Sequence, residues 1–319
     1  MKQGKIHSVN GLINPEEQLF FQSHEHLLIA PGHSGEVNPA LCFCDYEKSL
    51  QELGSYATSG GQALVDAQPV GCGRMAKELR QLSKDSGIEI IASTGFHKML
   101  FYPERHWNFT ATSDCLTELY IRELRLGMYE DPDEVFPENQ TDVKAGQIKT
   151  AMEADELNVQ YEKMFLAAAD AANATGAPLM VHVENGYNPE RYLQFLLDNG
   201  VKAEQLIFCH MDRACKDLGL HKALASAGVF LEYDTIAREK YHSDEQEINL
   251  FLAMIDAGFE DSLLFSLDTT RERLRAYSGK VGLDYILQSF ILKMKNSGIT
   301  QEQIDKISRK NPAVAFAWL

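Results

Sequence analysis

The sequence predicts an α/β fold in which eight parallel strands and the helices between them form a (β/α)8, or TIM, barrel. Two observations lead to this prediction: eight short apolar runs alternate with longer amphipathic segments, and metal-binding residue types stand where several runs end. Eight parallel strands close such a barrel, and a barrel of 319 residues can be one domain, here 1–319. A doubly wound open sheet is the alternative arrangement of the same elements.

The apolar runs are the predicted strands. They are rich in β-branched or aromatic residues, as strands buried on both faces of a parallel sheet are. In chain order they occupy 19–24, 63–69, 89–96, 143–149, 178–183, 205–210, 229–234 and 262–268.

Amphipathic segments between the runs are the predicted helices. The clearest, 154–174, has acidic residues near its start and Gly176 just after its end, which are typical start and stop signals. The others are 46–58, 74–85, 113–129, 189–199, 214–226, 243–257, 281–296 and 301–316.

The composition narrows the class of protein. Lysine and arginine number 30 against 46 aspartates and glutamates, a formal charge of −16, which disfavours nucleic acids and anionic membranes as partners. A small anionic substrate stays possible, because a local basic cluster can sit in an acidic protein. We find neither a long apolar span nor a signal-peptide pattern, so we expect a cytoplasmic protein whose six cysteines are reduced.

Residues with metal-binding side chains close five of the predicted strands. The carboxyl ends of barrel strands meet on one face, which carries the active site of such enzymes. Each residue alone has an ordinary explanation, such as a hydrogen-bonded core histidine or a helix-capping aspartate. Together they predict a metal centre at that face. The residues are His24, His26, Lys149, His182, His210 and Asp268.

The donor types indicate which metals fit. Four imidazoles and a carboxylate suit zinc, with manganese, cobalt or nickel as rivals. A protonated amine cannot ligate a metal, but carbon dioxide can convert a neutral, desolvated lysine to a carbamate with two oxygens. We therefore expect Lys149 to be carbamylated. The competing Lys144 lies five residues earlier, so it would point to the opposite face of the strand, towards the helices.

In its motifs the chain resembles the phosphotriesterase-like branch of the amidohydrolase superfamily, and among its members the phosphorylated sugar lactonases most closely. The motifs span nearly the whole chain in the family's order. They are SHEHL (23–27), DAQPVGCGR (66–74), STGFH (93–97), AGQIK (145–149), VHVEN (181–185), CHMDR (209–213), EYDTIAREKY (232–241), LDTTR (267–271) and NPAVAF (311–316).

The resemblance implies a binuclear metal centre and a hydrolytic mechanism. A hydroxide bridging two cations would attack the substrate, and Asp268 would pass its proton to the leaving alkoxide. Asp212 or Asp234 could orient a ligand imidazole. The implied assignment is His24, His26 and Asp268 on the more buried metal, His182 and His210 on the more exposed one, and carbamylated Lys149 bridging both.

Basic residues after the seventh and eighth strands indicate an anion site, because these loops frequently bind phosphate in barrels. Arg238 and Tyr241 also follow the seventh strand, and Arg273 the eighth. Our predicted substrate-binding residues are Lys240 and Arg271 first, then Arg275 and Tyr277.

The predicted function is therefore a lactonase that opens a phosphorylated or otherwise anionic sugar lactone. The alternatives are a phosphotriesterase or aryl esterase of the same fold and, with less support, a non-catalytic metal-binding barrel. A homodimer is an expectation of the family resemblance. The rim loops 31–45 and 97–112 contain further candidate substrate contacts: His33, His97, Lys98, Tyr102 and His106, of which His97 and Lys98 leave the third strand at the active face.

Overall fold

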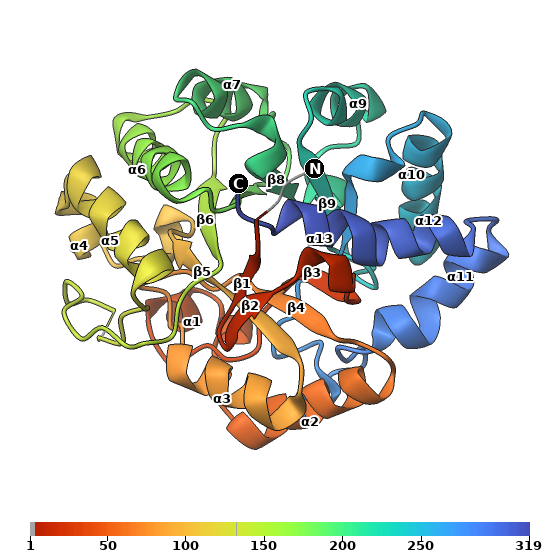
Figure 1. Cartoon of the computed structure of the whole chain (residues 1–319), viewed down its shortest axis with the longest axis horizontal. Coiled ribbons are helices and arrows are strands. Elements are labelled where there is room, and N and C mark those ends of the chain that lie inside the picture. Colours follow the sequence, from red (N-terminus) through yellow and green to blue (C-terminus); the bar gives the residue numbers. More distant parts are fainter. Residues whose placement is uncertain (1–3, 132) are drawn as a thin grey trace.

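Eight parallel strands form a nearly closed barrel with helices around it (Figure 1). The computed structural model describes residues 4–131 and 133–319. Hydrogen-bonded neighbours run β10-β9-β8-β7-β6-β5-β4-β3, so every strand lies beside its sequence neighbour and the doubly wound alternative is wrong. The strands are β3 (Phe21–Glu25), β4 (Ala63–Asp66), β5 (Glu89–Gly95), β6 (Gln147–Met152), β7 (Leu179–Val183), β8 (Leu206–Cys209), β9 (Phe230–Tyr233) and β10 (Leu263–Phe265).

Helices form the outer layer of the barrel. Two C-terminal helices contain π-helical turns, Ile286–Phe290 leading into α11 and Lys306–Lys310 between α12 and α13. The α-helices are α1 (His33–Val37), α2 (Tyr46–Thr58), α3 (Ala76–Ser86), α4 (Trp107–Thr110), α5 (Ser113–Arg125), α6 (Val159–Thr175), α7 (Glu190–Asp198), α8 (Met211–Ala214), α9 (Leu218–Ser226), α10 (Asp244–Asp256), α11 (Ile291–Asn296), α12 (Gln301–Asp305) and α13 (Asn311–Ala315).

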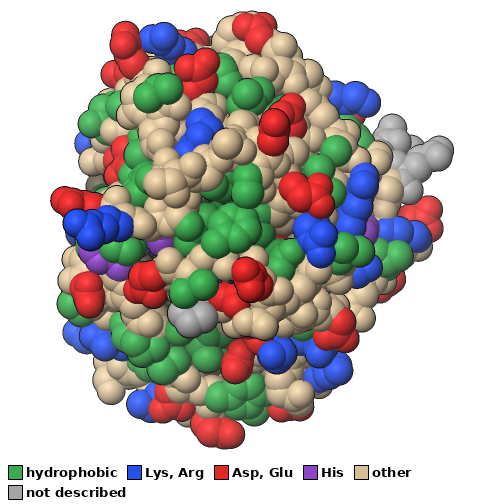
Figure 2. All heavy atoms as spheres, turned by 90° about the vertical axis from the view of Figure 1, so that its left-hand side faces the viewer, with side chains coloured by type: hydrophobic (Ala, Val, Ile, Leu, Met, Phe, Trp, Pro, Cys, Tyr) green, Lys and Arg blue, Asp and Glu red, His purple; other side chains and the backbone are tan. Residues whose placement is uncertain are grey.

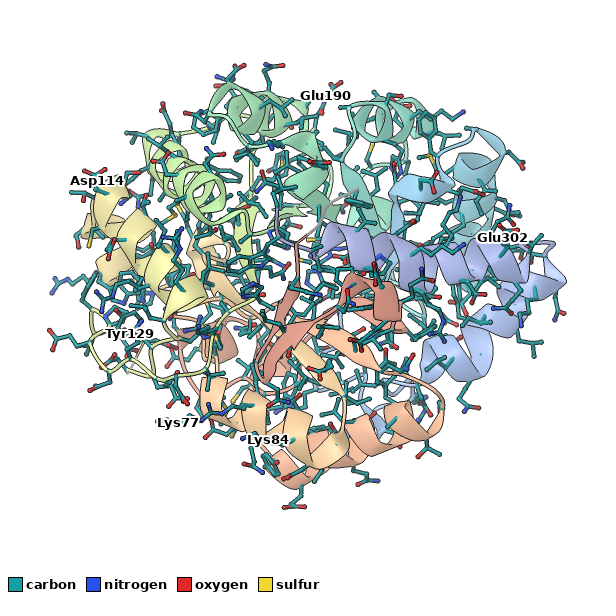
Figure 3. All side chains as sticks on the ribbon, in the orientation of Figure 1. Lys77, Lys84, Asp114, Tyr129, Glu190 and Glu302 are labelled. Carbon is teal, nitrogen blue, oxygen red and sulfur yellow. The ribbon has the colours of Figure 1, made fainter. Side chains whose placement is uncertain are left out.

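The outward faces of these helices are polar. Side chains labelled in Figure 3, such as Lys84 of α3, Asp114 of α5 and Glu190 of α7, lie on the outer ring, away from the barrel axis. Acidic and basic side chains are interspersed over the face shown in Figure 2. Among the described residues, none of the helices combines the length and the apolar composition of a membrane-spanning segment.

Several predicted boundaries were wrong, among them those of the fourth strand and of the clearest helix. The fourth strand starts at Gln147 and continues to Met152, because Gly146 packs against the His7 carbonyl oxygen and the apolar pattern runs on past Lys149. Helix α6 starts only at Val159, since the Asn158 side chain accepts hydrogen bonds from the next backbone N–H groups and so caps it there.

An N-terminal hairpin that we did not predict covers the amino-terminal end of the barrel. Strands β1 (Ile6–Ser8) and β2 (Gly11–Ile13) pair antiparallel and lie, with α13, across the barrel end in Figure 1. Ile6 also bridges to Ala317, and the Trp318 indole donates to the Gly146 carbonyl at 2.9 Å. Three-residue strands are too short for alternation to be recognised in a sequence.

Glu25 joins the last strand of the barrel to the first. Its fully buried carboxylate accepts hydrogen bonds from the Ser266 hydroxyl (2.6 Å), the Leu267 N–H (2.9 Å) and the Thr269 N–H (3.0 Å), all after β10. These bonds accompany the backbone bond from Asp268 N–H to the His24 carbonyl. Glu25 lies between the candidate ligands His24 and His26, and it therefore fixes the end of β3 against the residues that follow β10.

We expect Glu25→Gln to lower the free energy of unfolding by about 2–3 kcal/mol, because its amide NH2 would face a donor that is buried and has no alternative partner. Urea unfolding checks the value. Glu47→Gln, an exposed change on α2, is the control. A loss below about 0.5 kcal/mol would mean that water or a shifted neighbour satisfies these donors.

Candidate metal centre and active site

The six predicted metal ligands line one cavity at the carboxyl ends of the strands. The cavity has a volume of about 630 Å³. Lys149 lies inside β6 rather than at its end, yet its side chain still enters this cavity, because alternate residues of a barrel strand point inward. The competing Lys144 is exposed and precedes β6, so it points to neither face of the strand.

Buried carboxylates of β9 and of the residue that follows it orient two histidines. Glu232 Oε2 lies 2.9 Å from His24 Nδ1, and Asp234 Oδ1 lies 2.7 Å from His210 Nδ1. Asp234 also accepts a hydrogen bond from the His210 N–H at 3.0 Å. The Nε2 atoms of both rings therefore remain available to the centre, as metal-binding histidines require. Of the two candidates that we predicted, Asp212 and Asp234, it is Asp234 that orients a ligand imidazole. Glu232, which orients the other, was not predicted.

Burial keeps these imidazoles neutral. It lowers the pKa of His24 and of His210 well below 6.5, and that of His182 to about 3. A neutral imidazole has the free electron pair that a metal needs. These three histidines therefore have the protonation state that a metal site needs at neutral pH.

Asp268 presents one oxygen to the histidines and the other to an arginine. Oδ1 lies 3.6 Å from His26 Nε2, while Oδ2 accepts a 2.7 Å hydrogen bond from Arg238 Nη1. Burial raises the pKa of Asp268, but Arg238 and the histidines outweigh burial and lower it well below its usual range. The backbone φ of Asp268 is 48°, in the left-handed region that aspartate tolerates better than most residues.

The residues present fit a divalent metal. One donor atom each of His24, His26 and Asp268 lies within 4.8 Å of the other two. His182 Nε2 is buried without a hydrogen-bond partner among the described residues, and the His182 and His210 ring centroids are 4.4 Å apart. Buried nitrogen atoms without partners are unfavourable unless a ligand satisfies them.

Lys149 is buried among groups that do not neutralise an ammonium. Its Nζ lies 3.1 Å from His24 Nε2, 3.6 Å from Met180 Sδ and 3.9 Å from Cys209 Sγ, and its side chain is 1% exposed. In the described part of the chain no carboxylate pairs with it. An isolated buried charge is costly, which favours chemistry that removes or balances it.

Three cations lie close to the ring of Tyr241 in the loop after β9. Lys240 Nζ lies 4.6 Å, Arg213 Cζ 5.1 Å and Arg238 Cζ 5.9 Å from the ring centroid, and all four residues line the cavity. Burial raises the pKa of Tyr241, but the cations, Arg213 first, outweigh burial and lower it. This side of the cavity is therefore suited to an anion.

The other predicted substrate residues lie outside the cavity lining. Arg271 reaches the Cys42 carbonyl at 3.5 Å, Arg275 pairs with Asp284, and the Tyr277 hydroxyl lies 2.9 Å from Ser49 Oγ. The short helix Arg275–Tyr277 packs against α2, so this part of the segment turns away from the metal cluster. Thr270, Arg273 and 278–281 line the cavity in their place.

Two of the five rim-loop candidates reach the cavity. His97 packs against His182 with ring centroids 5.6 Å apart, and Lys98 Nζ donates to Glu184 at 2.5 Å. Tyr102 accepts a hydrogen bond from the His97 N–H and so supports this wall from behind. The other two, His33 and His106, do not line the cavity.

A second polar cluster holds the Tyr241 loop in place. His242 Nε2 lies 2.9 Å from Glu247 of α10 and 3.4 Å from Asp212 of α8. Burial lowers the pKa of His242, but the two carboxylates raise it to about 10, so the ring is a cation. Asp212 also accepts a hydrogen bond from the Thr235 N–H at 2.6 Å. This cluster therefore joins the Tyr241 loop to α8 and α10.

The sequence matches the model of the phosphotriesterase family over residues 4–316. The chain belongs to this family. The predicted resemblance is confirmed, and with it the conclusion that the chain is a metal-dependent hydrolase.

Relatives in this family include lactonases and an amide hydrolase. The N-acetyltaurine hydrolase of Danio rerio is 27% identical, with 97% of each chain covered. The phospho-furanose lactonase of Mycoplasmopsis agalactiae is 25% identical, covering 98% of this chain and 91% of the relative. The crystal structure of the lactonase Lmo2620 from Listeria monocytogenes superposes with a TM-score of 0.89 at 29% identity and covers 99% of both chains.

Proposed function

We propose that the chain hydrolyses a lactone that carries a phosphate or a similar anionic group. The observation that carries this proposal is Lys240, a cation in the cavity wall for which the described residues offer no carboxylate partner. Its position beside the metal-type cluster would hold an anion while the ester lies at the centre. The phospho-furanose lactonase among the relatives supports this substrate class.

We propose a catalytic centre with two divalent metal ions, most simply zinc, and a carbamylated Lys149. His24, His26, Lys149, His182, His210 and Asp268 would hold the metals, which supply a Lewis acid and an acidified water. Asp268 Oδ1, on the histidine side, would accept a proton from the attacking water and deliver it to the leaving alkoxide oxygen. Arg238 would hold Oδ2 and so fix the direction of the carboxylate.

We expect Lys240→Ala to raise KM for a phosphorylated furanose lactone about 10- to 100-fold, with kcat little changed. The reason is that Lys240 binds the phosphate equally in the ground and transition states. KM for the unphosphorylated lactone should stay within about twofold. Steady-state hydrolysis on metal-loaded protein measures both values.

Lys216→Ala is the matched control, because Lys216 is exposed and lines a neighbouring hollow rather than the cavity. An equal rise in KM for both lactones would refute the assignment of Lys240 to the phosphate.

A second candidate is hydrolysis of an amide that bears a sulfonate. The N-acetyltaurine hydrolase of Danio rerio supports it, because that amide carries a tetrahedral anion that would suit the same cationic wall. Neutral aryl phosphotriesters are the third class, but they carry no negative charge that these cations could bind. A substrate panel of phosphorylated lactones, N-acyl aminosulfonates and aryl phosphotriesters separates the three by kcat/KM.

A further inference from the structure

A second group of metal-binding side chains lies outside the cavity that holds the candidate metal centre. One donor atom each of Asp212, His242 and Glu247 lies within 4.8 Å of the other two. The three residues line a separate hollow of about 420 Å³, and none of them lines the cavity. They come from α8, from the loop after β9 and from α10, so a ligand bound by all three would hold three separate segments together.

Glu247 brings a buried carboxylate without hydrogen bonds into this group. Its side chain is 1% exposed, and neither oxygen has a hydrogen-bond partner among the described residues. His242 Nε2 lies 2.9 Å from Glu247 Oε2, but it lies equally close, at 2.9 Å, to Thr235 Oγ1. One ring nitrogen carries at most one N–H, and only the contact with Thr235 has the geometry of a hydrogen bond. A buried carboxylate left in this way is unfavourable unless another group satisfies it.

The charges around Glu247 indicate that a cation is the missing partner. Burial and then the neighbouring Asp212 raise the pKa of Glu247 to about 8, although His242 acts in the opposite direction. The residues around this carboxyl group therefore stabilise its charge poorly. A divalent cation between the two carboxylates would stabilise both charges at once.

The other two side chains are oriented as metal ligands usually are. Asp212 Oδ2 accepts hydrogen bonds from the Thr235 N–H at 2.6 Å and from the Thr235 hydroxyl at 2.5 Å. The second ring nitrogen of His242, Nδ1, lies 3.4 Å from the Ser243 carbonyl oxygen, so Nε2 is the nitrogen that faces the carboxylates. Such outer contacts fix the direction of a ligating carboxylate or imidazole.

Zinc suits this donor set. Two carboxylates and one imidazole can supply three protein ligands, and water can complete a tetrahedral site. The ion would take the place of the proton that the two carboxylates stabilise on His242, and this proton would be released on binding.

We propose that Asp212, His242 and Glu247 form a zinc-binding site that is separate from the candidate metal centre and fixes the loop after β9 to α8 and α10. Tyr241, next to His242, lines both the cavity and the hollow, so zinc bound here would stabilise this wall of the cavity from outside. The inference does not depend on which substrate the cavity binds.

The first test is the zinc content of the whole protein after dialysis at one fixed concentration of free zinc. We expect Glu247→Gln to bind about one zinc ion fewer per chain than the unsubstituted protein. Glu245→Gln makes the same change at an exposed position of α10 and should lose none. Because His182 belongs to the cavity, Glu247→Gln should cause the same loss when it is added to His182→Ala.

The second test is thermal unfolding with zinc and with a chelator. Zinc should raise the Tm of Glu247→Gln less than that of the unsubstituted protein and of Glu245→Gln, because the variant has one stabilising ion fewer. A purely structural role of Glu247 would instead lower the Tm equally under both conditions. His242→Gln removes a different ligand of the same site, and it decides the matter if Glu247→Gln does not fold.

An unchanged zinc content in a folded Glu247→Gln protein would overturn the inference. An equal rise in Tm with zinc in all variants would also overturn it, because hydrogen bonds and ion pairs alone would then hold the cluster. A zinc loss that disappears in the His182→Ala background would do the same, since it would show that the substitution acts on the candidate metal centre.

Discussion

Replacing Lys149 with alanine is expected to lower hydrolytic activity about 1000-fold or more, together with the content of bound metal. The Nζ atom lies 3.1 Å from His24 Nε2, inside the ring of candidate ligands. Alanine leaves that position empty, so the proposed metal centre would lose the donor oxygens that a carbamylated Lys149 would supply. Elemental analysis and lactone hydrolysis measure the two effects on the same preparation.

Lys149→Glu separates the loss of a ligand from the loss of a lysine. Its carboxylate sits on a shorter stem but supplies two oxygens, so it should retain more metal and more activity than the alanine variant. Native mass spectrometry of the protein without substitutions should show the added mass of one carbon dioxide, which both variants should lack. Lys144→Ala, an exposed change before β6, is the control. Full metal content and activity in Lys149→Ala would exclude a ligand role.

The sequence was sufficient to predict the barrel and to predict that six metal-binding side chains lie together in one cavity at its carboxyl end. An apolar run predicts a strand without any knowledge of what packs against it, and the carboxyl ends of parallel barrel strands always meet on one face. His182 and His210 therefore came together in the structure although their strand boundaries were only approximate. Even Lys149, placed at the wrong point along its strand, kept the inward side.

The parts that were missed depend on contacts between loops. Arg275 and Tyr277 stand in the expected segment, but a short helical turn packs them against α2. Arg213 lies in the CHMDR motif, but its place in the cavity wall was missed, because its neighbours Glu184 and Tyr241 are distant in sequence. Such placements follow from tertiary packing and not from any periodic pattern.

Asp268→Asn is expected to lower kcat for an aliphatic lactone by about 10²- to 10⁴-fold, the range for losing a positioned proton carrier. Asparagine keeps the shape of the side chain and tolerates the φ of 48°. Its amide has one oxygen, so it cannot serve both the histidine side and Arg238, and it cannot accept a proton as a carboxylate does. Steady-state kinetics with metal content measured in parallel check this result.

The leaving group distinguishes proton transfer from metal binding alone. An aryl ester releases a phenolate that needs little protonation, whereas a lactone releases an alkoxide that needs a proton. The loss in Asp268→Asn should therefore be smaller for the aryl ester. Asp256→Asn, an exposed change on α10, controls for the preparation. Equal losses on both substrates would mean that Asp268 acts only as a metal ligand. Another group in the cavity would then have to transfer the proton.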